Sequence, residues 1–222
     1  MVNINMKADQ EKNHQLDNRF LVEKIGVSRE TCENMRLYYN LLFQWNKKIN
    51  LVSRKSIDSS WTRHFLDSAQ LWFSLPKGVN TWLDFGSGAG FPGLVISTIA
   101  KELKPDLRVI LVEKNRKKGH FLEAVVEKLS LNATVICSRI EEIEPQKVDV
   151  ISARAVGRLK SLIEVAYTHR NDKTIGFFPK GKKYRAELEE SLQYWIFEVR
   201  QVTNLFDKDS PILEIRNIEV AK

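Results

Sequence analysis

A glycine-rich turn near the middle of the chain has the composition of a ligand-binding loop. A short apolar run over residues 81–85 precedes it, and a helix is expected over residues 92–103 after it. A strand, a glycine turn and a helix in this order place backbone N–H groups and a helix N-terminus beneath a ligand. The glycines occupy alternate positions, Gly86, Gly88 and Gly90. The sequence therefore predicts a small-molecule site at this turn.

The residues around the turn favour one class of ligand. The dinucleotide fingerprint G-x-G-x-x-G needs a third glycine where this chain has Phe91, and no Lys-Ser or Lys-Thr pair follows to make a P-loop. Asp84, two residues before Gly86, would repel a pyrophosphate but suits a cationic or amino-bearing ligand. These features point to S-adenosylmethionine, whose sulfonium and amino group are positively charged.

Glu113 is the second candidate carboxylate of this site. It ends the next predicted strand, residues 107–113, and lies 23 positions beyond Gly90. An acid in this position can accept hydrogen bonds from both hydroxyls of a ribose, as it also does for NAD-type ligands. Such charge-assisted bonds contribute on the order of 1.5–3 kcal/mol each. The alternative is that Glu113 only pairs with Lys114 or Arg116.

Basic residues are concentrated in three groups. The chain has 35 Lys and Arg against 28 Asp and Glu, a net charge of +7. Cations at the start of the helix expected from residue 116 oppose the helix dipole and cost about 0.3–1 kcal/mol each, so local stability does not explain them. A polyanionic substrate would explain them, and a solvated surface is the alternative. The groups are Lys47, Lys48, Arg54, Lys55 and Arg63; Lys114, Arg116, Lys117 and Lys118; and Lys180, Lys182, Lys183 and Arg185.

Helix and strand patterns alternate along most of the chain, which predicts a parallel sheet with an antiparallel edge formed by the last two strands. We therefore expect an N-terminal helical extension over residues 1–78 and a Rossmann-like α/β domain over residues 79–222. The expected helices cover residues 28–50, 57–75, 92–103, 116–131, 159–169 and 184–195, and the expected strands residues 81–85, 107–113, 133–137, 148–153, 174–178, 197–205 and 212–220.

Composition excludes several classes of protein. With 222 residues, 43% of them apolar, the chain suits one large domain or one domain with an appendage. It lacks both a long apolar stretch and the apolar core of a secretory signal. Cys32 and Cys137 stand 105 positions apart, which excludes a disulfide scaffold and a Cys-based zinc site, and Cys137 is expected to be a core thiol. We expect a reduced cytoplasmic monomer without a metal or a membrane segment.

Two ordered segments resemble those of one known family. They are Arg63-His64-Phe65-Leu66-Asp67-Ser68 and the glycine segment Leu83 to Gly93, which ends in Phe-Pro-Gly. On these residues the chain resembles the RsmG (GidB) family of bacterial small-subunit ribosomal RNA guanine-N7 methyltransferases, from about residue 30 to the C-terminus. Weaker matches are Trp45-Asn46-Lys47 with Asn50-Leu51, Ser138 to Glu142, Ser152 to Ala155, and Lys180-Gly181-Lys182.

The resemblance implies a class I S-adenosylmethionine-dependent methyltransferase with a mostly parallel, seven-stranded sheet. It implies S-adenosylmethionine as cofactor and 16S ribosomal RNA, or the small-subunit particle, as partner. It places cofactor contacts on Gly86, Phe91, Ile140, Glu141 and Arg154, with Ile140 and Glu141 near the adenine. The alternatives are a simple turn for Ile140 and Glu141, and a salt bridge to a nearby carboxylate for Arg154.

Arg63 and His64 are expected at the mouth of the pocket or on the RNA surface. Alternatively, Arg63 pairs with Asp67 at i,i+4 spacing, and His64 is an ordinary packed histidine. We expect further RNA contacts from Lys180, Lys182 and Lys183, and from Arg116, Lys117 and Lys118.

No catalytic base is predicted, because guanine N7 carries a free lone pair and no proton. Three other functions stay open from the residues alone. They are a nicotinamide-dependent oxidoreductase, a methyltransferase of another RNA or of a small molecule, and a non-enzymatic nucleic-acid-binding protein.

Overall fold

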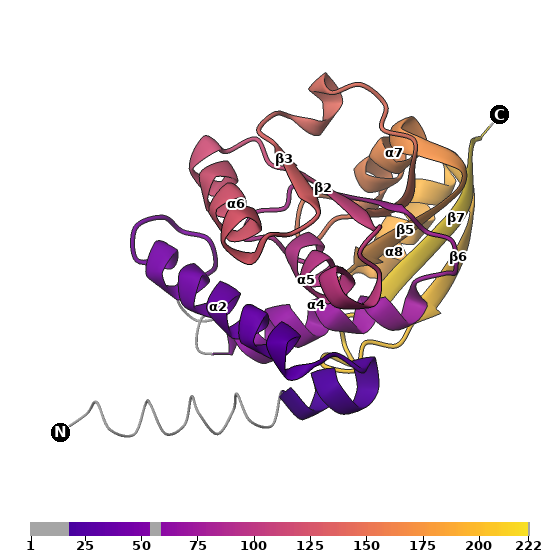
Figure 1. The fold of residues 1–222 in the computed structure, drawn as a ribbon. Coiled ribbons are helices and arrows are strands. Elements are labelled where there is room, and N and C mark those ends of the chain that lie inside the picture. The colour runs from indigo at the N-terminus through magenta and orange to yellow at the C-terminus, as the bar shows by residue number, and fades with distance from the viewer. Residues whose placement is uncertain (1–17, 54–58, 222) are drawn as a thin grey trace.

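The described part of the chain forms a single sheet with helices on both faces (Figure 1). The computed structural model describes residues 18–53 and 59–221; Arg54, Lys55 and the expected start of the second helix at residues 57–58 lie outside this part. The strands are β1 (Thr81–Phe85), β2 (Arg108–Val112), β3 (Ala133–Ile136), β4 (Val148–Ser152), β5 (Arg170–Pro179), β6 (Trp195–Val202) and β7 (Ile212–Val220).

The strand order is β3-β2-β1-β4-β5-β7-β6. The first five strands pair in parallel, and β7 is antiparallel to both β5 and β6, so the prediction of a parallel sheet with an antiparallel edge is confirmed. The chain leaves β1 for β2 on one side and later returns to β4 on the other. The loops after β1 and β4 therefore diverge and leave a crevice at their carboxyl ends.

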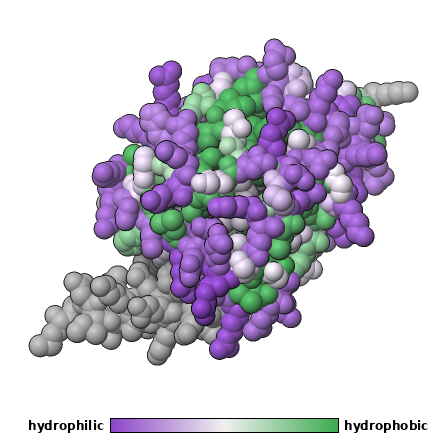
Figure 2. Space-filling view, viewed as in Figure 1, coloured by the Kyte–Doolittle hydropathy of each residue, from purple (hydrophilic) through white to green (hydrophobic). Residues whose placement is uncertain are grey.

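Helices cover each face of the sheet. Buried Leu94, Val95 and Phe121 place α5 and α6 in one apolar cluster, and buried Leu162 and Ile163 place α7 in the other, where α8 also packs. The face seen in Figure 2 is mostly hydrophilic, with hydrophobic residues exposed between the hydrophilic ones. These helices are α5 (Gly93–Leu103), α6 (Arg116–Leu129), α7 (Leu159–His169) and α8 (Tyr184–Leu192).

The N-terminal helices share the core of the sheet on the α5/α6 face. Ser28 caps α2 by accepting the Thr31 N–H, and Glu102 of α5 accepts from the backbone N–H of Ser28 and from the Thr31 hydroxyl, which joins α2 to α5. No helix of the described residues is long and apolar enough to cross a bilayer. The N-terminal elements are η1 (Phe20–Ile25), α2 (Arg29–Asn46), η2 (Trp61–Leu66), α4 (Asp67–Ala69) and η3 (Gln70–Ser74).

Element boundaries agree with expectation for some elements and differ for others. The strands β1 and β7 and helix α7 have the expected bounds. The helix expected up to residue 195 ends at Leu192, and Trp195 already belongs to β6. Strand β5 begins at Arg170, four residues early, because the Asn171 side-chain amide donates to Asp149 at 2.9 Å and the Thr174 hydroxyl donates to the Val148 carbonyl.

Tyr38 of α2 fixes the N-terminal helices to the glycine turn. Its side chain is fully buried, its hydroxyl donates to the Ala89 carbonyl, and its ring packs against Phe65, Phe91 and Phe121.

We expect Tyr38→Phe to lower the free energy of unfolding by about 1–2 kcal/mol, because the buried Ala89 carbonyl loses its donor. Tyr194→Phe is the control, since Tyr194 is 46% exposed and should change stability by less than about 0.5 kcal/mol. Urea denaturation measures both variants. An equal loss in the two would contradict the role of the Tyr38 hydroxyl.

Candidate functional site

A cavity of about 950 Å³ opens at the carboxyl ends of β1, β4 and β5. Its floor is the turn after β1, and its walls come from the loop after β4, the end of β5, the helical segment around His64, and the β6–β7 loop. This volume suits a small-molecule ligand. The lining residues from the glycine turn and the strand ends are Gly86, Ser87, Gly88, Ala89, Phe91, Arg154, Ala155, Pro179, Lys180 and Gly181.

The glycine turn has a backbone that only glycine adopts easily. Gly86 and Gly88 have φ of +62° and +57°, in the left-handed region. A Cβ at Gly86 would lie 2.5 Å from Cγ2 of Val156, so the backbone packs directly on that side chain. A Cβ at Gly88 would meet nothing closer than the Gly86 carbonyl oxygen at 3.7 Å. Gly88 therefore leaves open space along the floor of the cavity.

Asp84 lies below the turn, completely buried at the end of β1. The Ser152 hydroxyl donates to its Oδ1 at 2.7 Å, and the Gly93 N–H donates to its Oδ2 at 3.4 Å. Burial raises the pKa of the Asp84 carboxyl to about 6. Asp84 does not line the cavity itself, so its charge acts on the cavity from beneath the turn.

Glu113 holds the turn from the side of β2. Its carboxylate is 6% exposed and accepts the Gly88 N–H at 2.9 Å and the Asn115 N–H at 2.8 Å. Among the described residues no ion pair joins it to Lys114 or Arg116. Glu113 therefore fixes the position of the turn, beside the cavity rather than in its lining.

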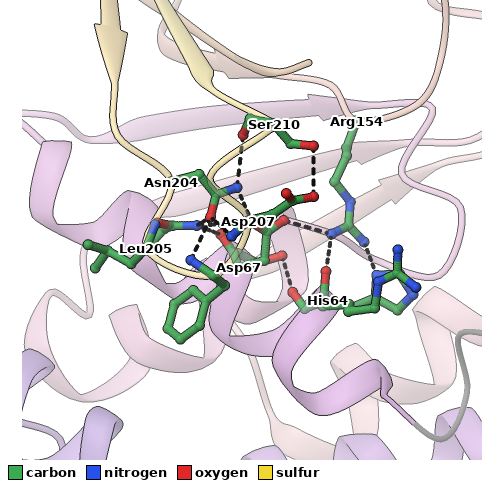
Figure 3. A network of polar contacts seen from close by, with 11 residues as sticks. His64, Asp67, Arg154, Asn204, Leu205, Asp207 and Ser210 are labelled. Atoms are coloured by element: carbon green, nitrogen blue, oxygen red, sulfur yellow. Dashed lines mark hydrogen bonds and ion pairs between the residues drawn. The ribbon is translucent and has the colours of Figure 1, made fainter. Parts of the chain in front are cut away.

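Arg154, which follows β4, reaches across the cavity to the N-terminal helical segment (Figure 3). Its Nη1 donates to Asp67 Oδ2 and to the Arg63 carbonyl, both at 3.1 Å, and its Nη2 lies 3.0 Å from His64 Nδ1. The guanidinium carbon is 5.0 Å from the Phe91 ring centroid. Arg154 thus both lines the cavity and forms the salt bridge considered as its alternative, while Asp67 pairs with Arg154 rather than with Arg63.

The other oxygen of Asp67 connects this ion pair to the β6–β7 loop (Figure 3). Asn204 Nδ2 donates to Asp67 Oδ1 at 2.7 Å, and Gln70 Nε2 donates to the same oxygen at 3.0 Å. Asn204 Oδ1 in turn accepts the backbone N–H groups of Phe206 and Asp207. One carboxylate therefore joins β4, the helical segment and the β6–β7 loop.

Burial disfavours the charged forms of the side chains in this network. It raises the pKa of Asp67 and lowers that of Arg154, in each case against the attraction of the partner. Burial, with the positive charge of Arg154, lowers the pKa of His64 to about 3. His64 is therefore neutral near pH 7, and its Nδ1 accepts from Arg154, which leaves the proton on Nε2.

Two predicted adenine contacts lie apart from the cavity. Ile140 and Glu141 belong to the short helix η4 (Ile140–Glu142) that follows β3. Ile140 is buried and Glu141 is exposed, and neither lines the cavity. Cys137, just after the edge strand β3, is exposed, so the expectation of a core thiol is wrong.

The predicted RNA-binding residues divide into two sets. Arg63, His64, Lys118 and Lys180 line the cavity, but the Lys180 ammonium pairs with Glu187 at 2.6 Å and its side chain is only 8% exposed. The others are exposed and lie outside the cavity lining; they are Arg116, Lys117, Lys182 and Lys183.

Some lining residues were not predicted. Leu51, Val52 and Ser53 form part of the wall, and Asn46 positions them by accepting the Leu51 and Val52 N–H groups at 2.8 and 3.0 Å. Asn46 and Leu51 both belong to the segments that resemble the family, and this could have indicated that residues 51–53 lie near the cavity. The strand expected over residues 197–205 included Asn204, but β6 ends at Val202 and Asn204 belongs to the β6–β7 loop. The lining residues of this loop are Asn204, Phe206, Asp207 and Ser210.

No group of three or more His, Cys, Asp or Glu side chains that could hold a metal ion occurs in residues 18–53 and 59–221. The polar side chains of the cavity lining include the cations Arg63, Lys118, Arg154 and Lys180 and the carboxylates Asp67, Glu187 and Asp207.

We expect Asp67→Asn and Arg154→Met each to lower the free energy of unfolding by about 3 kcal/mol, because each leaves a largely buried charge, 17% or 12% exposed, without its partner. The double variant should lose clearly less than the sum, since no lone charge remains. Urea denaturation of the four proteins measures this coupling. Additive losses would show that the pair is not coupled.

We expect Asp84→Asn to remove a pH dependence of stability. The raised pKa means that the folded state binds more protons than the unfolded state between about pH 4 and pH 6, so wild-type stability falls as pH rises through that window. The difference is on the order of 2–3 kcal/mol. Denaturation curves at several pH values test it, and parallel profiles for the two proteins would contradict it.

Comparison with known proteins identifies the family of this chain. A family model, GidB, described as rRNA small subunit methyltransferase G, matches residues 31–215. Ribosomal RNA small subunit methyltransferase G of Cereibacter sphaeroides is 41% identical over 196 residues, 88% of this chain and 95% of that protein. The protein of the same name from Jannaschia sp. is 43% identical over 190 residues, 86% and 90% of the two chains.

Solved methyltransferase structures share the fold. An O-methyltransferase from Bacillus cereus in complex with SAH superposes with a TM-score of 0.56 at 14% sequence identity, over 90% of this chain and 96% of that chain. At this identity the likeness concerns the fold, and it confirms the predicted class I arrangement. From the sequence relatives and the family match, this chain belongs to the GidB family of small-subunit ribosomal RNA methyltransferases.

Proposed function

We propose that this chain transfers a methyl group from S-adenosylmethionine to N7 of a guanine in 16S ribosomal RNA, in the cytoplasm. The family match supports the reaction and the class of substrate. The observation that carries the cofactor assignment is the glycine turn, held between Asp84 below and Glu113 beside it at the carboxyl end of β1.

The residues present fit S-adenosylmethionine better than a pyrophosphate ligand. When bound, this cofactor supplies a methyl group on a positively charged sulfur. The completely buried Asp84 has hydroxyl and amide donors for its carboxyl and no ion pair within the described chain, so its negative charge favours a cation above the turn. Glu113 uses both oxygens on backbone N–H groups, and its further lone pairs can accept ribose hydroxyls.

Methylation of guanine N7 requires the protein to position the reacting atoms, and it requires no proton transfer. N7 carries a lone pair and no proton, so the side chains must hold the two reacting atoms in line. The neutral His64 and the Arg154 guanidinium, neutralised by Asp67, add no uncompensated positive charge to the wall. Positive charge moves onto the purine during transfer, and nearby cations oppose it. The cations of the lining without a carboxylate partner among the described residues are Arg63 and Lys118.

The reaction is tested by incubating the protein with S-adenosylmethionine and unmodified 16S ribosomal RNA or small ribosomal subunits, followed by mass spectrometry of the nucleosides. We expect 7-methylguanosine at a single position. Methylation of another base, or of another atom of guanine, would overturn the proposed specificity.

We expect Glu113→Gln to weaken S-adenosylmethionine binding about 10- to 100-fold, because charge-assisted bonds contribute on the order of 1.5–3 kcal/mol each. Glu127→Gln is the matched control, since Glu127 is exposed on α6. Equilibrium dialysis measures affinity and urea denaturation checks folding. Equal affinities of the two variants would remove Glu113 from the cofactor site.

A further inference from the structure

A second cavity, of about 640 Å³, lies on the other side of the β6–β7 loop and shares Asn204 with the first. We call it the basic cavity, because its lining brings together cations from two separate loops. It is lined by Lys182, Tyr184, Arg185, Gln201, Val202, Thr203, Asn204, Leu205, Lys208, Asp209 and Pro211.

The basic cavity has an excess of positive charge. Lys182 Nζ pairs with Asp209 Oδ2 at 3.0 Å, and both side chains are largely exposed. Arg185 and Lys208 have no carboxylate partner among the described residues. Two unpaired cations facing one hollow attract an anion more strongly than isolated surface charges do.

The lining of the basic cavity also includes an aromatic and an apolar side chain, Tyr184 and Leu205. The Tyr184 hydroxyl donates to Gln201 Oε1 at 3.1 Å, and the Arg185 guanidinium carbon lies 5.6 Å from the Tyr184 ring centroid. Leu205, at the edge of the same hollow, is 58% exposed. Cations beside an aromatic ring and an apolar side chain are the combination that single-stranded RNA engages through phosphates and unstacked bases.

The two cavities are separated by two short loops whose residues alternate between them. In the loop after β5, Lys180 and Gly181 line the first cavity and Lys182 lines the second. In the β6–β7 loop, Asp207 lines the first cavity and Lys208 the second. A nucleotide chain that enters one cavity therefore needs to cross only this partition to reach the other.

We propose that the basic cavity binds the segment of substrate RNA next to the methylated guanine, through its backbone phosphates and one unstacked base. The inference rests on the proposed function. It assigns Arg185 and Lys208 to phosphates and the Tyr184 face to a base, while the target guanine occupies the first cavity with the cofactor.

The test compares Arg185→Gln/Lys208→Gln with Lys77→Gln/Lys173→Gln. The control double variant also loses two positive charges, from exposed residues near the amino ends of β1 and β5, at the opposite edge of the sheet. Filter binding of unmodified 16S ribosomal RNA is measured over a salt series, and S-adenosylmethionine affinity is measured by equilibrium dialysis.

We expect Arg185→Gln/Lys208→Gln to weaken RNA binding at least about tenfold and to lower the slope of log affinity against log salt by about 1.5, as for two lost phosphate contacts. Its affinity for S-adenosylmethionine should equal that of the wild type. Tyr184→Leu should weaken binding with no change in the salt slope, because stacking releases no counterions.

Two failures can be told apart. If the wild-type protein binds and methylates the RNA while the Arg185/Lys208 variant loses no more affinity than the control, the basic cavity is not an RNA site. If the wild type neither binds nor methylates 16S ribosomal RNA, the proposed function fails, and this inference fails with it.

Discussion

The partly buried ion pair between Arg154 and Asp67 joins segments that are far apart in the sequence. Arg154 follows β4, Asp67 belongs to the helical segment before β1, and Asn204 ties the β6–β7 loop to the same carboxylate. Because burial disfavours both charges, the pair holds only while each hydrogen bond around it is satisfied. The ion pair therefore holds three walls of the cavity together.

The carboxyl of Asp84, below the glycine turn, lowers the stability of the folded protein near neutral pH. A carboxyl at Asp84 that is completely buried, with only neutral donors and a raised pKa, makes the folded protein less stable near neutral pH. An asparagine or leucine there would be easier to bury. The proposed cofactor site would account for the acid, because its negative charge favours a cationic ligand above the turn.

Local patterns predicted most of the sheet because each buried strand is a short apolar run bounded by turn residues. β1 lies between the Pro76–Gly78 break and the glycine turn, and it was predicted to the residue. Polar positions carry no such signal, which is why the start of β5 was missed: Asn171 is held by Asp149, 22 residues earlier in the chain. Cys137 was misplaced because β3 is an edge strand, and no neighbouring strand covers the residue just after its end.

Only those parts of the candidate site whose residues are close in the sequence or lie on neighbouring strands could be predicted from the sequence. The glycine turn, Asp84 and Glu113 are close in sequence or lie at neighbouring strand ends, so pattern and topology bring them together. Arg154 and Asp67 are 87 residues apart, and the nearer partner at i,i+4, Arg63, was the natural local choice. Lys180, expected to face RNA, instead turns to Glu187 of α8, a pairing set by where that helix begins.

The connection between β6 and β7 forms a wall of both hollows. The length of this loop is therefore constrained by both cavities, whereas most surface loops tolerate changes in length. If the loop were a few residues shorter, the two cavities would merge into one groove. If it were a few residues longer, the partition that the proposed RNA segment would cross would be wider. Insertions and deletions in relatives should accordingly be rare here and common in the turns at the opposite rim.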